Sequence, residues 1–141
     1  MDEKQRQLLA ANAFMRHNGI SVTEITSEHA VAVLHVAPES LNPYGCLHGG
    51  AYFTMADAAS GALARYDGRS YVTISSSFNF IRPVSSGQVT AMANLRHRGR
   101  TTCLTSVSVT DEAGNLLACG DFTFFCVPAP ALSSARLEGQ E

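Results

Sequence analysis

Residues 51–65 read AYFTMADAASGALAR, and this run decides the fold. Alanine, the strongest helix former, is dense in it. Apolar and small side chains surround the predicted helix on almost every side, which is typical of a buried helix. The small residues also let neighbouring strands approach closely. We expect the turn signal Asp67-Gly68 to end this region.

The rest of the chain reads mainly as strands. Two runs rich in β-branched and aliphatic residues come before the helix, at 20–27 and 30–37. Four runs with a period of two follow it, at about 71–81, 87–98, 101–110 and 115–127. Residues 2–17 read as a separate amphipathic helix that ends at Asn18-Gly19. A curved antiparallel sheet wrapped around one long helix satisfies the burial of both, which predicts an α+β fold.

The length of 141 residues is ordinary for one domain, which we place at 1–127. Residues 128–141 hold two prolines and no periodic pattern, so we expect a mobile tail there. Charged residues make up 16% of the chain. This low share indicates apolar surface that a partner subunit covers.

Charge and hydropathy argue against several classes of function. The net charge of −2 argues against a nucleic-acid binder. No apolar run approaches the roughly 20 residues that span a bilayer, and the polar N-terminus lacks a signal-peptide core. We therefore expect a cytoplasmic protein with no membrane partner. The four cysteines include no C-x-x-C pair, which favours free buried thiols.

Asp57 is the unusual residue of the predicted helix. Aspartate is a poor interior helix residue because its side chain competes for backbone groups. It also rarely enters a core without a partner. One interpretation is a carboxylate on the helix's one exposed stripe. The other is a carboxylate that faces a cleft, where burial makes it a stronger base.

The string His48-Gly49-Gly50 stands at the start of the same helix. Backbone N–H groups there find no partner inside the helix, and with the positive end of the helix dipole they offer an anion or oxyanion site. Asn42 adds an amide upstream, although Asn42-Pro43 is also an ordinary turn signal. Taken alone, the histidine is better explained as a structural cap of the loop. Together with Asp57, the set combines an oxyanion donor, an imidazole and a carboxylate.

The run from Asn42 to Asp57 resembles the signature of the PaaI-type hotdog thioesterases. It carries Asn-x-x-Gly-x-x-His-Gly-Gly, with the aspartate nine residues after the histidine. The later runs VT at 72–73, NFIRP at 79–83 and HRGR at 97–100 match as well. The resemblance covers about 19–127. It implies a hotdog fold, hydrolysis of acyl-CoA thioesters, and no metal or redox cofactor.

The family pattern also implies a role for each matching residue. Asp57 corresponds to the carboxylate that acts as general base on water or as nucleophile, and the Gly49 N–H to the group that polarises the thioester carbonyl. His48 and Asn42 correspond to residues that orient substrate and water. Thr73 corresponds to a hydroxyl that helps to place the water. The family builds each site across a dimer interface, and its dimers often pair into tetramers.

Arg82, Arg96, Arg98 and Arg100 are four of only ten lysine and arginine residues. They are explained either as a solvated hairpin or as a site for the phosphates of CoA, which the fork of arginine suits. The resembled family binds CoA near these segments, which favours the second interpretation.

Several alternatives stay open. A non-catalytic acyl-CoA-binding protein is separated from an enzyme only by assay, and a hydratase of enoyl-CoA would carry a Gly-Asp-x-Asn-Pro-x-His loop that this chain lacks. A Cys46–His48 nucleophile has no evident orienting residue, and Cys46, His48 and His35 lack the spacing of metal ligands. The acyl group is open between aryl and medium-chain groups, because four aromatic residues fit either a pocket or the core: Tyr52, Phe53, Phe78 and Phe80.

Overall fold

The computed structural model describes residues 1–128, so the predicted tail lies outside the described residues except for Pro128. The helical elements are α1 (Glu3–Ala10), α2 (Ala13–His17), α3 (Gly49–Ala64) and the short 3-10 helices η1 (Pro38–Ser40) and η2 (Arg65–Asp67). The strands are β1 (Ile20–Ile25), β2 (His29–His35), β3 (Ser70–Phe80), β4 (Gln88–Arg98), β5 (Thr102–Thr110) and β6 (Leu116–Val127).

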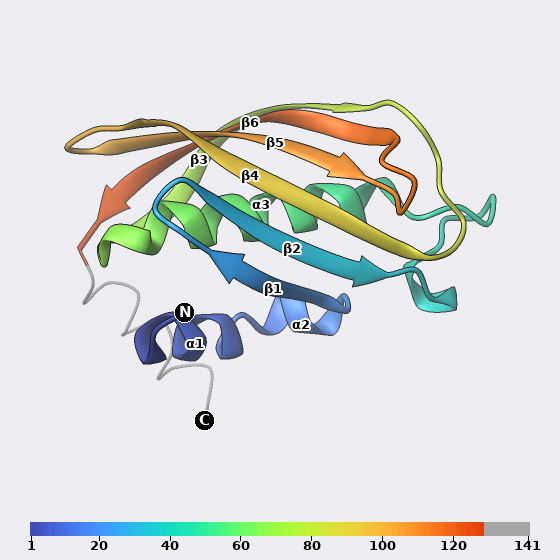
Figure 1. The fold of residues 1–141 in the computed structure, drawn as a ribbon, viewed down its shortest axis with the longest axis horizontal. Coiled ribbons are helices and arrows are strands. Elements are labelled where there is room, and N and C mark those ends of the chain that lie inside the picture. Colours follow the sequence, from blue (N-terminus) through green and yellow to red (C-terminus); the bar gives the residue numbers. More distant parts are fainter. Residues whose placement is uncertain (129–141) are drawn as a thin grey trace.

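The strands form one antiparallel sheet in the order β1-β2-β4-β5-β6-β3, which curves around α3 (Figure 1). α3 contacts all six strands, and its core-facing side chains are buried from Tyr52 to Ala64. The sequence prediction of a curved sheet around one long buried helix is confirmed. Among residues 1–128, no helix combines the length and the hydropathy needed to cross a bilayer.

The register of β3 defines the two ends of the molecule. Ser70 pairs with Val127 at one end, and Phe80 pairs with Ala118 at the other. The first end also holds the C-terminus of α3 and the β4–β5 hairpin, whose Arg98 reaches the carbonyl oxygen of Ala64. The N-terminus of α3 and the β5–β6 turn lie at the opposite end (Figure 1).

The prediction of one helix over residues 2–17 is wrong, because the segment forms α1 and α2 with a break between them. The side chain of Asn12 accepts a hydrogen bond from the backbone N–H of Met15 at 3.2 Å. Asparagine is among the best N-cap residues, so it starts a second helix where the apolar pattern alone continues the first. The break lets α2 turn against β1 instead of extending past it.

The remaining differences concern element ends. β1 stops at Ile25 instead of residue 27, because the Thr26 hydroxyl bonds the backbone N–H and C=O of His29 and closes the hairpin. α3 begins at Gly49 and not at residue 51, since His48 caps it. Side chains that bond backbone groups thus set boundaries that periodicity does not mark.

Arg98 fixes the C-terminus of α3. Its guanidinium donates to the carbonyl oxygens of Leu63 and Ala64 at 3.0 and 2.8 Å and to Asp67 Oδ2 at 2.9 Å. These carbonyls belong to the last turn of the helix, where no helical N–H remains to bond them. The guanidinium also complements the negative end of the helix dipole.

Asp67 is the carboxylate that pairs with Arg98 at the C-terminal end of α3. Burial opposes its ionisation, but hydrogen bonds from Tyr71 and Arg69 and the charge of Arg98 outweigh that effect and lower the pKa of Asp67. Burial and the bond to Asp67 raise the pKa of Tyr71 to about 12. Arg98 and Asp67 are therefore both charged at neutral pH.

We expect Arg98→Met to destabilise the protein by roughly 1–3 kcal/mol at neutral pH, because it leaves helix carbonyls and a carboxylate without their donor. Urea unfolding of both proteins measures this difference. The pKa of Asp67 is lower in the folded protein than in the unfolded chain, so ionised Asp67 stabilises the folded protein at pH values above the unfolded-state pKa. This stabilisation is lost as the pH falls through the folded-state pKa. The difference between the two proteins should therefore shrink below about pH 4. Equal stability of the two proteins at neutral pH would contradict this role of Arg98.

Candidate functional site

His48 caps the N-terminus of α3. Its Nδ1 accepts a hydrogen bond from the backbone N–H of Gly50 at 2.8 Å. Since Nδ1 acts as acceptor, the neutral ring carries its proton on Nε2. In this tautomer Nε2 is a hydrogen-bond donor, whereas Nδ1 is occupied by the Gly50 N–H.

Gly49 offers the unpaired donor at this helix end. Its backbone N–H bonds no acceptor within the described chain, whereas that of Gly50 is already taken by His48. A Cβ on Gly49 would meet the Phe80 ring at 3.3 Å. Glycine therefore lets the aromatic ring lie against the backbone and leaves the N–H at the positive end of α3 for a developing negative charge.

Asp57 lies on the outward face of α3, where it is half-buried. The Thr73 hydroxyl of β3 donates to its Oδ1 at 2.7 Å. The structure thus brings together two of the residues selected from the sequence. The bond occupies one carboxylate oxygen, fixes the orientation of the group and leaves the second oxygen available to a water molecule.

Gly49 and Asp57 are separated within one protomer. They lie about 12 Å apart along the axis of α3, because each helical residue adds about 1.5 Å. A general base and an oxyanion donor must both come within hydrogen-bond reach of the reacting atoms. One protomer therefore does not present both groups to the same carbonyl.

Asn42 shapes the loop before α3. Its Oδ1 accepts the backbone N–H groups of Tyr44 at 2.9 Å and of Cys46 at 3.1 Å. This use of the oxygen leaves the side-chain NH₂ as the group that remains to orient a ligand. The loop borders a hollow of about 620 Å³ beside the first turns of α3, which His48 and Thr54 line. Its volume falls in the range of small-molecule sites.

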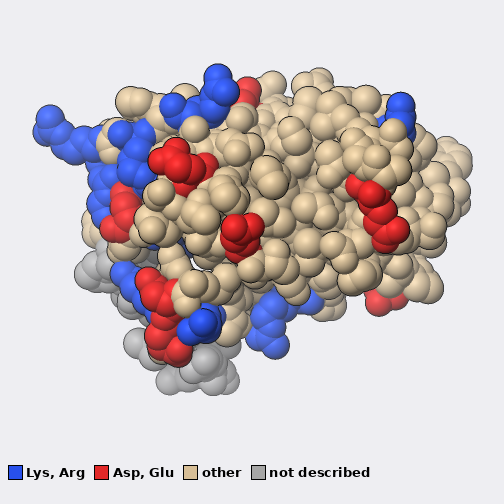
Figure 2. Space-filling model, in the orientation of Figure 1, with Lys and Arg blue, Asp and Glu red and all other residues tan. Residues whose placement is uncertain are grey.

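The four arginines do not form one cluster in a protomer. Arg96, Arg98 and Arg100 belong to the β4–β5 hairpin, whereas Arg82 follows β3 at the other end of the sheet and donates its backbone N–H to Leu117. Figure 2 shows Lys and Arg gathered at the end of the visible face where Figure 1 places that hairpin. The Arg98 guanidinium is occupied by the end of α3 and by Asp67. Arg82, Arg96 and Arg100 are exposed and are better placed for a ligand.

Aromatic rings connect Gly49 to the neighbourhood of Asp57. Phe80, which lies against Gly49, is 5.2 Å from Phe78, and Phe78 is 5.5 Å from Phe53, both between ring centroids. Phe53 precedes Asp57 by one helical turn and is 38% exposed, and Phe80 is 56% exposed. The sequence left these residues open between core and pocket. Phe53 and Phe80 present an apolar wall beside the candidate site.

The sequence analysis did not select Arg65. Asp57, Gly61 and Arg65 follow one another at four-residue spacing, which places them along one face of α3.

Comparisons with known proteins identify the family of this chain. The sequence profile described as "Thioesterase superfamily" matches residues 44–118, which is more than half of the chain. The chain belongs to the thioesterase superfamily. The matched region includes α3 with Gly49 and Asp57, and also β3, β4 and β5.

Relatives of this thioesterase-superfamily chain are similar along most of its length. A putative esterase, ComA2, of Bacillus subtilis is 34% identical over 70% of this chain and 82% of that protein. The acyl-coenzyme A thioesterase PaaI of Escherichia coli is 28% identical over 71% of this chain and 72% of that protein. The PaaI-type hotdog family, predicted from the sequence, is confirmed, and the chain is a thioester hydrolase.

A solved structure extends the likeness to three dimensions. A hypothetical thioesterase of Streptococcus pneumoniae, solved with coenzyme A, superposes with a TM-score of 0.79 at 30% identity. The match covers 86% of this chain and 95% of that one. The sheet wrapped around α3 is therefore the hotdog fold.

The cysteines play no part in this geometry. Cys46, Cys103, Cys119 and Cys126 are free thiols. Burial raises the pKa of the Cys103 thiol, which makes it a poor nucleophile. Within residues 1–128, no three His, Cys, Asp or Glu side chains gather closely enough to hold a metal ion.

Proposed function

We propose that this chain hydrolyses acyl-CoA thioesters at sites that two protomers share. The observation that carries the proposal is the spacing along α3. A carboxylate with its hydroxyl partner and a free N–H at a helix N-terminus lie about 12 Å apart in one chain. Two antiparallel copies of α3 would place Asp57 of one protomer beside Gly49 of the other. One thioester carbonyl could then reach both groups.

The edge strand β3 supports a second copy of the chain as the partner. Its unpaired edge carries exposed apolar side chains, with Ile74 at 55% and Phe80 at 56% exposure. A long apolar edge strand invites pairing with another chain. Pairing of β3 with β3 about a two-fold axis is antiparallel, and it also makes the two α3 helices antiparallel. We propose such dimers, which pair further into tetramers.

In the proposed reaction, water attacks the thioester carbonyl carbon while Asp57 accepts a proton from it. Thr73 orients the carboxylate, and the Gly49 N–H of the second protomer bonds the oxygen on which negative charge develops. The carbon–sulfur bond then breaks, and the CoA thiolate leaves with a proton returned from Asp57. In the nucleophilic variant, the Asp57 carboxylate attacks the carbonyl carbon, the carbon–sulfur bond breaks and the CoA thiolate leaves, and water then cleaves the resulting anhydride. His48 and Asn42 orient substrate and water from the same loop as Gly49.

The proposed dimer would also bring exposed arginines of the two protomers to the same CoA molecule. Antiparallel pairing of β3 brings the Arg82 end of one protomer toward the β4–β5 hairpin of the other. We therefore propose that Arg82 of one chain and Arg96 or Arg100 of its partner bind the phosphates of CoA. Arg98 contributes indirectly, because its guanidinium holds α3. We further propose that residues 1–127 act as one domain in the cytoplasm.

Asp57→Asn should lower kcat for acyl-CoA hydrolysis by roughly 10²–10⁴ while the protein stays folded, because the amide cannot accept the proton. A spectrophotometric assay of released thiol measures the rate on a panel of aryl and medium-chain acyl-CoA substrates. Asp121→Asn on the exposed face of β6 is the matched control and should keep full activity. Near-normal turnover by Asp57→Asn would remove the carboxylate from the mechanism.

A mixture of Asp57→Asn and Gly49→Pro proteins should recover activity that neither protein has alone, because proline removes the N–H at the first position of α3, where a helix tolerates it. In a heterodimer one site carries both changes and the other carries neither, so a randomly exchanged equal mixture regains roughly a quarter of the normal rate. The assay follows activity after subunits are dissociated and reassembled together. No recovery, although mass spectrometry detects heterodimers, would contradict a shared site.

Replacing Arg82 and Arg100 with glutamine should raise KM for acyl-CoA and leave kcat nearly unchanged, since phosphate contacts are made equally in the ground and transition states. Added salt should raise the KM of the unsubstituted protein toward that of the variant, because salt screens exposed charges. A short thioester without the nucleotide is the control and should show little change. An unaltered KM for acyl-CoA would place the nucleotide elsewhere.

A further inference from the structure

Phe53 lies between Gly49 and Asp57 on one stripe of α3. The three residues follow one another at four-residue spacing, which places them on the same face of the helix. Phe53 is 38% exposed, although most of the helix around it is buried. An aromatic ring thus stands midway between the proposed oxyanion donor and the proposed base, on the face that the proposed function turns toward a second protomer.

Other aromatic rings hold the side chain of Phe53 in place. Its ring centroid is 5.2 Å from that of Phe122, which is fully buried, and 5.5 Å from that of Phe78, edge-on at 81°. Phe78 lies against the backbone of β6, since a Cβ on Gly120 would come within 2.7 Å of its ring. Aromatic pairs at these distances attract each other. The Phe53 ring therefore has a defined position, and its exposed part faces away from the rings that support it.

A two-fold axis that relates two shared sites must pass beside Phe53. In the proposed dimer, Asp57 of one α3 stands level with Gly49 of the other, antiparallel α3. Phe53 is halfway between these two residues, so it is the residue that stands level with its own copy. Each shared site then lies four residues from the axis, or about 6 Å along the helix. The two Phe53 side chains face each other between the two sites.

The two ends of a bound thioester lead in opposite directions from the reacting carbonyl. Arg82 follows β3 at one end of the sheet, and the β4–β5 hairpin lies at the other end (Figure 1). Antiparallel pairing brings Arg82 of one protomer and the hairpin of its partner together at the outside of the dimer, far from the two-fold axis. A CoA moiety bound there leads outward from the carbonyl. The acyl group then leads inward, toward the pair of Phe53 rings.

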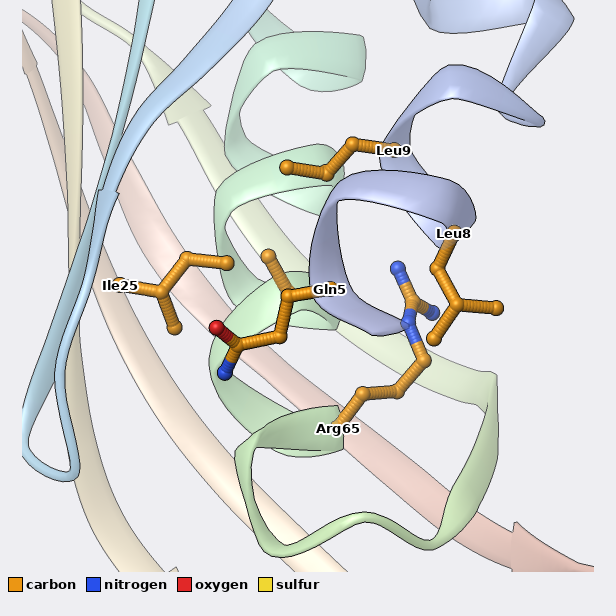
Figure 3. A pocket seen from close by; sticks show the side chains of 6 residues that line it. Gln5, Leu8, Leu9, Ile25 and Arg65 are labelled. Atoms are coloured by element: carbon orange, nitrogen blue, oxygen red, sulfur yellow. The ribbon is translucent and has the colours of Figure 1, made fainter. Parts of the chain in front are cut away.

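Two other spaces beside α3 fit an apolar acyl chain poorly. The cavity between α1 and the end of α3, which Figure 3 shows beside Leu8, Leu9 and Arg65, measures about 10 Å³. That volume holds no more than about one water molecule. The hollow of about 620 Å³ before α3 is lined by Arg16, Glu39 and three histidines, among other residues. An alkyl chain in that hollow would remove water from these polar groups without bonding them, which costs free energy.

We propose that the paired Phe53 rings close the acyl end of both shared sites and thereby select compact acyl groups over long unbranched chains. The inference rests on the proposed function, which places one site on each side of the axis. About 6 Å along the helix separates the reacting carbonyl from the ring pair. This distance accommodates a short chain or one aromatic ring, and an aromatic ring also packs favourably against Phe53. Phe53 is thus a specificity-determining residue for both sites at once.

The first test compares kcat/KM for butanoyl-, benzoyl- and decanoyl-CoA in the unsubstituted protein, Phe53→Ala and Phe53→Leu. The unsubstituted protein should prefer butanoyl- and benzoyl-CoA. Alanine should raise the ratio of decanoyl- to butanoyl-CoA hydrolysis roughly tenfold, because it opens space beyond the carbonyl. Leucine keeps most of the apolar volume, which secures the fold, and should raise the ratio less.

Phe125→Ala is the matched control for these variants. Phe125 is 41% exposed and lies on the opposite face of the sheet from the buried Phe124, so its replacement should leave the ratio unchanged. Equal hydrolysis of decanoyl- and butanoyl-CoA by the unsubstituted protein would overturn the selection of compact acyl groups. Ratios that stay constant in both active Phe53 variants would overturn the role of Phe53.

The second test examines the ring pair without turnover. In Phe53→Cys the two introduced thiols should face each other across the axis, so oxidation or a short bifunctional thiol reagent should join the protomers covalently. Mass spectrometry identifies the linked peptides, and the unsubstituted protein with its four free cysteines is the control. Dimers that form no link at position 53 would overturn the inference. Linked dimers of a protein that hydrolyses no acyl-CoA would uphold the Phe53 contact and overturn the proposed function, and a monomer in solution would overturn both.

Discussion

The burial of α3 is the constraint on which the rest of the structure depends. A sheet can close around a helix only if the helix presents small and apolar side chains, and the residues of α3 from Met55 to Ala64 meet this condition with one half-buried carboxylate among them. Both helix ends then need partners in a protein interior. His48 supplies the first and Arg98 the second. The same straight helix keeps Asp57 about 12 Å from Gly49, so the proposed site needs a second chain.

Most of this fold could be predicted from the sequence, because its periodicities are strong. The alanine-dense run specified the central helix, and the alternating runs after residue 70 specified four strands within one or two residues. Periodicity did not reveal the break at Asn12 or the start of α3 at Gly49. Both depend on a single side chain that bonds a backbone N–H, and such bonds compete with the regular pattern instead of following it.

The candidate site was predictable in its residue types but not in its geometry. Asp57 stood out because a charge interrupts an apolar helix, whereas its bond to Thr73 depends on the register of β3, which the sequence alone does not fix. For the arginines, nearness in the sequence does not mean nearness in the folded protomer. Arg82 and Arg100 are near in sequence, but antiparallel strands carry them to opposite ends of the sheet. Sequence proximity becomes proximity in space only if a second, antiparallel chain is added.

The distribution of charge along α3 would favour an antiparallel pair of these helices. The helix has a positive N-terminus, where the Gly49 N–H bonds no acceptor among residues 1–128, a carboxylate near its middle, and the cations Arg65 and Arg98 at its negative end. In one chain the carboxylate is too far from the positive end to benefit from it, since the effect fades within the first turn. Two antiparallel copies would place each Asp57 beside the positive terminus of the neighbouring helix. The field that polarises a thioester carbonyl would then also favour the ionised base, so catalysis and self-association would rest on one charge pattern.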